Sequence, residues 1–265
     1  ERGSVLVNWL SSRRANSLLA LLAFDLPLAP RLVGSRRFLA RHGVDPRECV
    51  EPQRLNTPRR IFERKIRYWE CRPMPEEAAV VVSPADSRVL IGSFAERSDL
   101  HVKGKLFSYT ELLGPTRAGW LSAFRGGDFA VFRLTPERYH YNHTPVAGRV
   151  LDVYTIDGAY HPCNPAALIQ QAHPHARNRR VVTIIDTDVP GGTGVGLVAM
   201  LEVVALMIGD VVQGYSERRY DEPRPLEPGL FLRKGCPKSL YRPGSSTDVV
   251  IFQPGRVRFH PRLLR

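Results

Sequence analysis

The pattern of apolar and polar positions changes at about residue 77. Before that point, apolar and basic side chains recur at helical spacing in two stretches, residues 4–24 and 58–72. After it, the apolar residues gather in short runs. The sequence therefore predicts a helical N-terminal region over residues 1–77, separate from a second region over residues 78–265.

The second region has the pattern of a β-structure. Short runs rich in Val, Ile, Phe and Tyr are bounded by Gly, Pro, Asp or Asn, and they cover residues 78–94, 126–135, 148–156, 179–189 and 248–259. A further apolar stretch, residues 196–212, fits a buried helix or a buried strand. We predict an α+β fold, in which the helical N-terminal segment precedes a compact β-rich catalytic body of mostly antiparallel short strands.

Composition and charge narrow the function classes. The chain of 265 residues is 43% hydrophobic, as a globular protein is, and carries a formal net charge of +12. Such a charge suits nucleic acid or an anionic membrane surface. No motif interleaves aromatic with basic residues, so the sequence favours a membrane surface, with nucleic acid excluded as a partner.

The most apolar segment, residues 17–30, is interrupted by Asp25, Pro27 and Pro30. It is shorter than the roughly 20 residues of a transmembrane helix, and arginines flank it. Two interpretations stay open: an element lying in the membrane interface, or a helical hairpin that covers the protein's own core. We expect a peripheral membrane protein on the cytoplasmic face.

The four cysteines are far apart and never in Cys-x-x-Cys spacing, at Cys49, Cys71, Cys163 and Cys236. This spacing argues against a zinc site or a disulfide framework and favours reduced thiols in a cytosolic setting. We expect no metal.

Three turn-like segments carry residue types that together can activate a hydroxyl. Asp86 follows an apolar run, His140 and His143 share the stretch "RYHYNHTP", and Ser245 follows Gly244 directly before a predicted strand. Each alone is an ordinary turn residue. Together, Asp86, His143 and Ser245 supply an orienting group, a base and a nucleophile, as in a serine hydrolase. Against a hydrolase, Ser245 lacks the Gly-x-Ser-x-Gly elbow and the chain lacks strand–helix alternation.

Seven segments, in order, resemble the phosphatidylserine decarboxylases, a pyruvoyl-dependent family. "VVSPADSRV" is similar to the family's Ser-Pro-Ala-Asp-Gly motif, and "LTPERYHYNHTPVAGRV" to its Tyr-His-x-x-His-x-Pro motif. The other segments are "HGVD" with "RLNTPRRIFERKIRYWECRPMP", "VKGKLFSYTELLG", "CNP" with "NRRVV", "GLVAMLEVVALMIGDV" and "RKGCPKSLYRPGSST". The resemblance runs from about residue 42 to 256.

The resemblance implies that the chain cuts itself between Gly244 and Ser245. The Ser245 hydroxyl would attack the Gly244 carbonyl, and β-elimination and hydrolysis would leave a pyruvoyl group on the new N-terminus. His143 would take the serine proton and Asp86 would hold the imidazole. Ser246 and Thr247 are the competing nucleophiles, and Ser245 is favoured because Gly244 before it tolerates strain.

The mature enzyme would decarboxylate phosphatidylserine to phosphatidylethanolamine through a Schiff base on the pyruvoyl carbonyl, without pyridoxal phosphate. The resemblance gives the acid–base work on the substrate to His140, with His143 as an alternative donor. Ser87, Val204 and Asp248 stand where the family has glycine, glycine and an apolar residue. These departures leave a soluble amino acid open as substrate. A serine hydrolase and a non-catalytic lipid-binding module are the remaining alternatives, and a homo-oligomer is also open.

Overall fold

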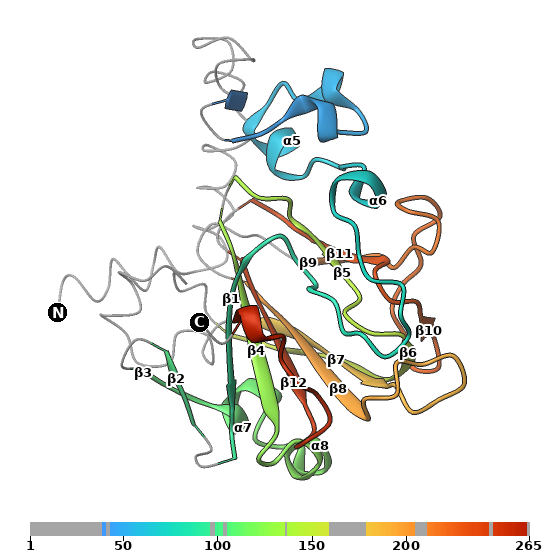
Figure 1. The fold of residues 1–265 in the computed structure, drawn as a ribbon. Coiled ribbons are helices and arrows are strands. Elements are labelled where there is room, and N and C mark those ends of the chain that lie inside the picture. Colours follow the sequence, from blue (N-terminus) through green and yellow to red (C-terminus); the bar gives the residue numbers. More distant parts are fainter. Residues whose placement is uncertain are drawn as a thin grey trace, which may run out of the picture.

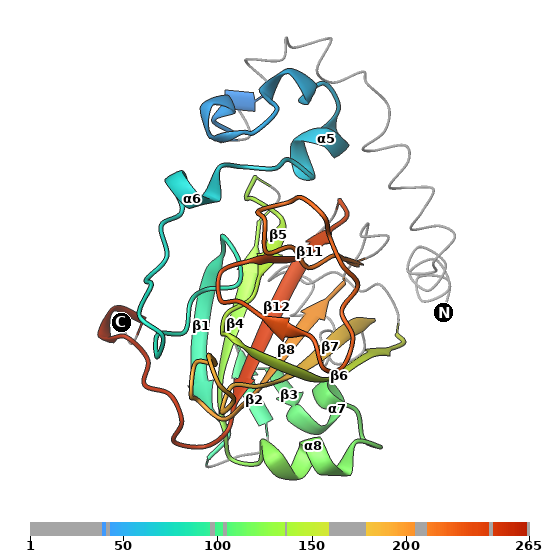
Figure 2. The ribbon, with the colours of Figure 1, turned by 90° about the vertical axis from the view of Figure 1, so that its right-hand side faces the viewer.

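The computed structural model describes residues 39–40, 43–95, 99–102, 105–135, 137–158, 179–204, 211–243 and 246–263. A seven-stranded sheet organises most of them, in the order β1-β4-β12-β8-β7-β6-β10, and every neighbouring pair is antiparallel. Figures 1 and 2 show this sheet from two directions. Its strands are β1 (Arg88–Ser93), β4 (Asp128–Leu134), β6 (Gly148–Ile156), β7 (Arg180–Asp186), β8 (Leu197–Val203), β10 (Phe231–Leu232) and β12 (Ser246–Phe252).

Both faces of this sheet are buried. On one face, Val249 and Ile251 of β12 join a core with Phe124 and with Leu112 and Leu113 of the helix α7 (Tyr109–Leu113). A second short helix, α8 (Ala118–Ala123), packs next to α7 at the lower end of the sheet in Figure 1. On the other face, Val250 and Phe252 of the same strand join a second core. All seven residues of β12 are therefore buried, which is typical of a central strand covered on both sides.

A three-stranded sheet, in the order β5-β11-β9, lies at the opposite end of the large sheet from α7 and α8 (Figures 1 and 2). It consists of β5 (Tyr141–His143), β9 (Val211–Gln213) and β11 (Pro237–Tyr241). A separate hairpin pairs β2 (Asp99–Val102) with β3 (Lys105–Ser108). The chain passes from β11 in the small sheet directly to β12 in the large one, so the connection between them, residues 242–245, joins the two sheets. We call this connection the cleavage segment.

The described residues 43–72 lie beyond the three-stranded sheet in Figure 1 and contain short helices. They are the 3₁₀ turns η2 (Pro46–Glu48) and η3 (Pro52–Arg54) and the helices α5 (Pro58–Phe62) and α6 (Tyr68–Cys71). The stretch predicted as one helix over 58–72 is thus two. The break follows from pairing with another segment: the N–H of Val50 donates to the carbonyl of Lys65, and Ile66 forms a bridge with Cys49.

The prediction of mostly antiparallel short strands is confirmed, and the ambiguous stretch 196–212 contains the strands β8 and β9. The helix predicted over residues 4–24 and the apolar segment 17–30 lie outside the described residues. Among those that are described, the structure contains no helix long and apolar enough to span a membrane. Cys49, Cys71 and Cys236 are free thiols, and Cys163 is not described. A domain boundary at residue 77 stays a prediction. The last element of the described chain is the 3₁₀ turn η4 (Pro261–Leu263).

Candidate active site

Both ends of the cleavage segment are anchored, although Gly244 and Ser245 themselves lie outside the described residues. On its N-terminal side, Arg242 donates to both carboxylate oxygens of Glu63 at 3.0 Å. On its C-terminal side, Ser246 begins β12 and pairs with Leu134 of β4. The segment is therefore held between an ion pair to the N-terminal region and the centre of the large sheet.

His140 lies next to the residue that enters this segment. The main-chain N–H of Tyr241 donates to the carbonyl of His140 at 3.1 Å, and the imidazole stacks on Phe62 with ring centroids 3.6 Å apart. Its Nδ1 donates to the carbonyl of Arg138 at 2.8 Å, because a carbonyl oxygen only accepts. Burial, helped by the charge of Arg64, lowers the pKa of His140 to about 3. The imidazole is neutral at physiological pH.

The Nε2 atom of His140 and the hydroxyl of Ser246 are both buried and have no hydrogen-bond partner among the described residues. Buried polar atoms are nearly always paired, so two such atoms need a reason. A common apolar cluster connects them: Phe62 stacks on His140 and packs with Leu134, the residue paired with Ser246. The structure thus brings a neutral histidine with a free ring nitrogen to the start of β12.

His143 has a different environment from His140. Its Nδ1 donates to the carbonyl of Gly235 at 2.7 Å, which leaves Nε2 as the acceptor for the hydroxyl of Tyr139 at 3.0 Å. Tyr68 meets the ring edge-on at 4.5 Å. Burial lowers the pKa of His143 to about 4, so this histidine too is neutral at physiological pH. His143 is the last residue of β5, and His140 directly precedes this strand. The two histidines do not lie in one turn, and their side chains have different surroundings.

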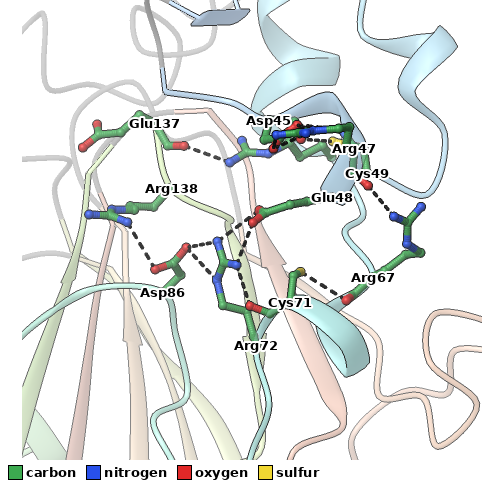
Figure 3. Close-up of polar contacts among 11 residues, drawn as sticks. Asp45, Arg47, Glu48, Cys49, Arg67, Cys71, Arg72, Asp86, Glu137 and Arg138 are labelled. Carbon is green, nitrogen blue, oxygen red and sulfur yellow. Dashed lines mark hydrogen bonds and ion pairs between the residues drawn. The ribbon is translucent and has the colours of Figure 1, made fainter.

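Asp86 is held by arginines (Figure 3). Arg72 contacts its Oδ2 at 3.1 Å and Arg138 its Oδ1 at 3.6 Å, while Arg72 also donates to both carboxylate oxygens of Glu48. Within the part of the chain that the structure describes, no hydrogen bond joins Asp86 to His143. Both line one pocket of about 560 Å³, together with Tyr68 and Tyr139. The predicted contact between Asp86 and the imidazole of His143 is therefore not formed in this structure, although both residues line the same pocket.

Comparison with known proteins fixes the family. A family model described as phosphatidylserine decarboxylase matches residues 59–263. The phosphatidylserine decarboxylase proenzyme of Bordetella petrii is 33% identical over 239 residues, which cover 84% of this chain and 78% of that protein. The proenzyme of Anaeromyxobacter sp. (strain K) is 30% identical over 92% of this chain and 86% of its own length. This chain belongs to the phosphatidylserine decarboxylase family. The resemblance found in the sequence is thereby confirmed, and with it a self-processing carboxy-lyase that uses a Ser-derived pyruvoyl group.

In this member of the family, a buried polar network lies behind the cleavage segment, and sequence reasoning missed it. Glu202 of β8 accepts from Lys238 of β11 at 2.7 Å and from Gln213 of β9 at 2.6 Å, and neither partner of the ion pair is exposed. Asn142 and Ser239 also donate to Glu202. The only signal in the sequence is a charged residue within an apolar strand-like run.

The same network contains Asp248, which is paired in register with Glu202. Asp248 is completely buried, and its Oδ1 lies 2.7 Å from the hydroxyl of Tyr241. Burial and the neighbouring Glu202 raise the pKa of Asp248 well above the ordinary value. Burial by itself also raises the pKa of Glu202, but the charge of Lys238 and the hydrogen bonds from Lys238, Ser239 and Gln213 together outweigh it, so that this pKa is lowered.

Proposed function

We propose that the chain cuts itself between Gly244 and Ser245, and that the resulting enzyme decarboxylates phosphatidylserine at the new N-terminus. The decarboxylase activity follows from family membership. The position of the cut and the roles of individual residues are inferred from the sequence motif and from the surroundings of the cleavage segment. The observation that carries the proposal is the neutral, unpaired Nε2 of His140 next to this segment.

In the cutting step, Ser245 Oγ attacks the Gly244 carbonyl carbon, the C–N bond breaks, and an ester joins the two residues. Elimination then releases the Gly244 carboxylate, and hydrolysis of residue 245 with loss of ammonia leaves the pyruvoyl group. The step requires a base for the serine proton, and His143 is the proposed base. Its support is the neutral imidazole with an accepting Nε2, because only the unprotonated ring takes up a proton.

Asp86 is proposed as the residue that positions His143. The main-chain N–H of His143 donates to the carbonyl of Pro84 at 2.7 Å, two residues before Asp86. The ion pairs of Asp86 with Arg72 and Arg138 fix this segment on its other side. Asp86 thus acts on the histidine through the Ser-Pro-Ala-Asp segment, and we propose that its carboxylate also favours the charged imidazole during proton transfer.

A pyruvoyl group supplies a carbonyl that condenses with a substrate amine and then withdraws electrons from the bond to the leaving carboxylate. The residues around the cleavage segment fit such a group: Phe62, Leu134, Val204, Val211 and Tyr241 form an apolar cluster that excludes water. His140 Nε2 is one of the buried polar atoms that have no partner among the described residues. We assign to His140 the acid–base work on the substrate: its unprotonated Nε2 takes up a proton from the substrate amine and returns it to the substrate carbon, with His143 as the alternative donor.

The substrate places the protein at a membrane. The net charge of +12 suits anionic lipid, with about 1 kcal/mol for each well-placed Lys or Arg. The basic and apolar residues of region 1–77 are the proposed docking element, which would make the protein peripheral on the cytoplasmic face. A homo-oligomer is compatible with this arrangement.

The test is the intact mass of purified protein under denaturing conditions. We expect two species, residues 1–244 and 245–265, with a pyruvoyl group on the smaller one. Ser245→Ala stays a single chain, while the matched control Ser246→Ala is still cut. A cut that persists in Ser245→Ala and disappears in Ser246→Ala would move the nucleophile by one residue. Release of CO₂ from phosphatidylserine vesicles, compared with free serine and aromatic amino acids, decides the substrate.

A further inference from the structure

We propose that Tyr241 and a protonated Asp248 form a hydrogen-bonded clamp that links the two ends of the cleavage segment and positions these ends before and after the cut. This inference rests on the proposed cleavage between Gly244 and Ser245. Tyr241 ends β11 directly before the segment, and Asp248 lies in β12 directly after it. The clamp therefore joins the two strands that the segment connects.

The hydrogen positions follow from counting donors. The Tyr241 hydroxyl lies 3.0 Å from the carbonyl oxygen of Thr247 and 2.7 Å from Oδ1 of Asp248. A hydroxyl has one proton, and a carbonyl oxygen only accepts. When Tyr241 donates to Thr247, the contact with Asp248 is satisfied only if the carboxyl carries a proton and donates to the tyrosine oxygen. The result is a directed chain from Asp248 through Tyr241 to the main chain of Thr247.

Charge counting leads to the same protonation state. Asp248 and Glu202 are opposite each other in neighbouring strands, and both are completely buried. The ammonium of Lys238, also completely buried, bonds to Glu202. One cation neutralises one carboxylate, and a second unpaired carboxylate at this depth is strongly unfavourable. Glu202 has four hydrogen-bond donors and keeps its charge, so Asp248 holds the proton.

The groups packed around Asp248 support this reading. β8 contributes Glu202, β4 places Phe132 opposite, and β11 contributes Tyr241 and Lys238. From the small sheet, Gln213 of β9 and Asn142 of β5 contact Glu202, the partner of Asp248, and the carbonyl of His140 accepts from the main chain of Tyr241. Tyr241 is itself a neutral phenol, because burial raises its pKa.

The clamp has a function because its two halves end on different fragments. After cleavage, Tyr241 is three residues from the new C-terminus at Gly244, and Thr247 is two residues from the new N-terminus. The hydrogen bonds of Tyr241 thus cross the cut. In the uncut chain they hold together the two ends of the segment that contains the scissile peptide, and in the mature enzyme they hold the ends of the two fragments together. Tyr241 and Asp248 are accordingly positioning residues, not catalytic ones.

The decisive comparison is between Asp248→Asn and Asp248→Val. The amide of asparagine donates to the tyrosine oxygen as a carboxylic acid does, whereas valine has a similar shape and no donor. The assay follows the conversion of newly synthesised proenzyme into two chains. We expect Asp248→Asn to be cut within about twofold of the wild-type rate, and Asp248→Val and Tyr241→Phe to be cut roughly tenfold more slowly. In the mature fraction, normalised to pyruvoyl content, Tyr241→Phe lowers kcat more than it raises KM for phosphatidylserine vesicles.

The matched control is Val250→Ala, a buried truncation on the same face of β12 that removes no hydrogen-bonding group of the clamp. Thermal unfolding in a Ser245→Ala background ranks the stability loss of each variant. The proposal is overturned if Asp248→Asn is as slow as Asp248→Val, if Tyr241→Phe is cut at the wild-type rate, or if Val250→Ala slows cutting as much at an equal stability loss. A wild-type chain that is never cut refutes the proposed cleavage instead.

Discussion

The buried ion pair between Lys238 and Glu202 offers a sharp test of how the network behind the cleavage segment contributes to stability. Lys238→Met removes the ammonium and keeps a side chain of similar length. It leaves Glu202 buried, 0% exposed, without the cation that lies 2.7 Å from its Oε2. Breaking a buried pair in this way costs about 3–5 kcal/mol, because the remaining charge is uncompensated.

The loss is measured as the midpoint of thermal unfolding in a Ser245→Ala background, so that every sample is one uncut chain. A loss of this size lowers the midpoint by roughly 6–20 °C. The double variant Lys238→Met with Glu202→Gln removes both charges and recovers most of the loss. The matched surface control is Arg218→Met: Arg218 pairs with Glu222 at 3.2 Å, but both side chains are more than 70% exposed, and its loss is below about 1 kcal/mol.

Two outcomes would refute the reasoning. If Lys238→Met costs no more than Arg218→Met, Lys238 does not compensate a buried charge. If the double variant is as unstable as Lys238→Met alone, the loss comes from packing of the lysine stem and not from an unpaired Glu202. Either result would also remove the charge-counting argument for a protonated Asp248.

Three further predictions concern other parts of the molecule. Burial lowers the pKa of His143 to about 4, so between pH 6.5 and 4 the unfolded chain binds a proton that the folded chain does not, and stability falls as the pH is lowered. His143→Gln lessens this loss of stability by roughly 2–3 kcal/mol when denaturation at pH 7.5 is compared with denaturation at pH 4.5, and an unchanged loss contradicts the prediction. Gly127→Ala lowers the thermal midpoint by the equivalent of about 1–3 kcal/mol, because the new Cβ would lie 1.9 Å from the carbonyl oxygen of Phe252; an unaltered midpoint argues against this contact. Arg72→Leu removes the ion pair with Asp86 and slows self-cleavage roughly tenfold, because the histidine base is misplaced. The rate is measured from the gel bands of the uncut and cut chains over time, and cutting at the normal rate would show that the ion pair has no positioning role.

Much of the fold is predictable from the sequence, because strands covered on both faces appear as short apolar runs between turn residues. The strands β1, β4, β6 and β7 all fall within such runs, and β12 begins two residues before one. Residues 196–212 were ambiguous since a short buried run has no period that separates helix from strand. The helix expected over 58–72 was interrupted by hydrogen bonds to residues 48–50, which no local pattern reveals.

The site was predictable only as a set of residues. The motifs identify Asp86, His140 and His143. They do not reveal that arginines contact the carboxylate of Asp86, or that Gly235 and Tyr139 form hydrogen bonds with the two ring nitrogens of His143. Asp248 was recognised as an unusual charge before an apolar run. Its relation to Glu202 depends on the register between β12 and β8, which a single sequence does not contain.

The position of the proposed cut explains how a chain can lose a peptide bond near its catalytic group and keep its structure. The bond lies in the connection between the two sheets, and the strand that follows it is paired with β4 on one side and β8 on the other. All seven residues of β12 are buried, with alternate side chains in the cores on the two faces of the sheet. Hydrogen bonds and apolar burial therefore retain the small fragment without a covalent link. The location of β12 in the middle of the sheet thus allows cleavage to create a new N-terminus without releasing it from the site.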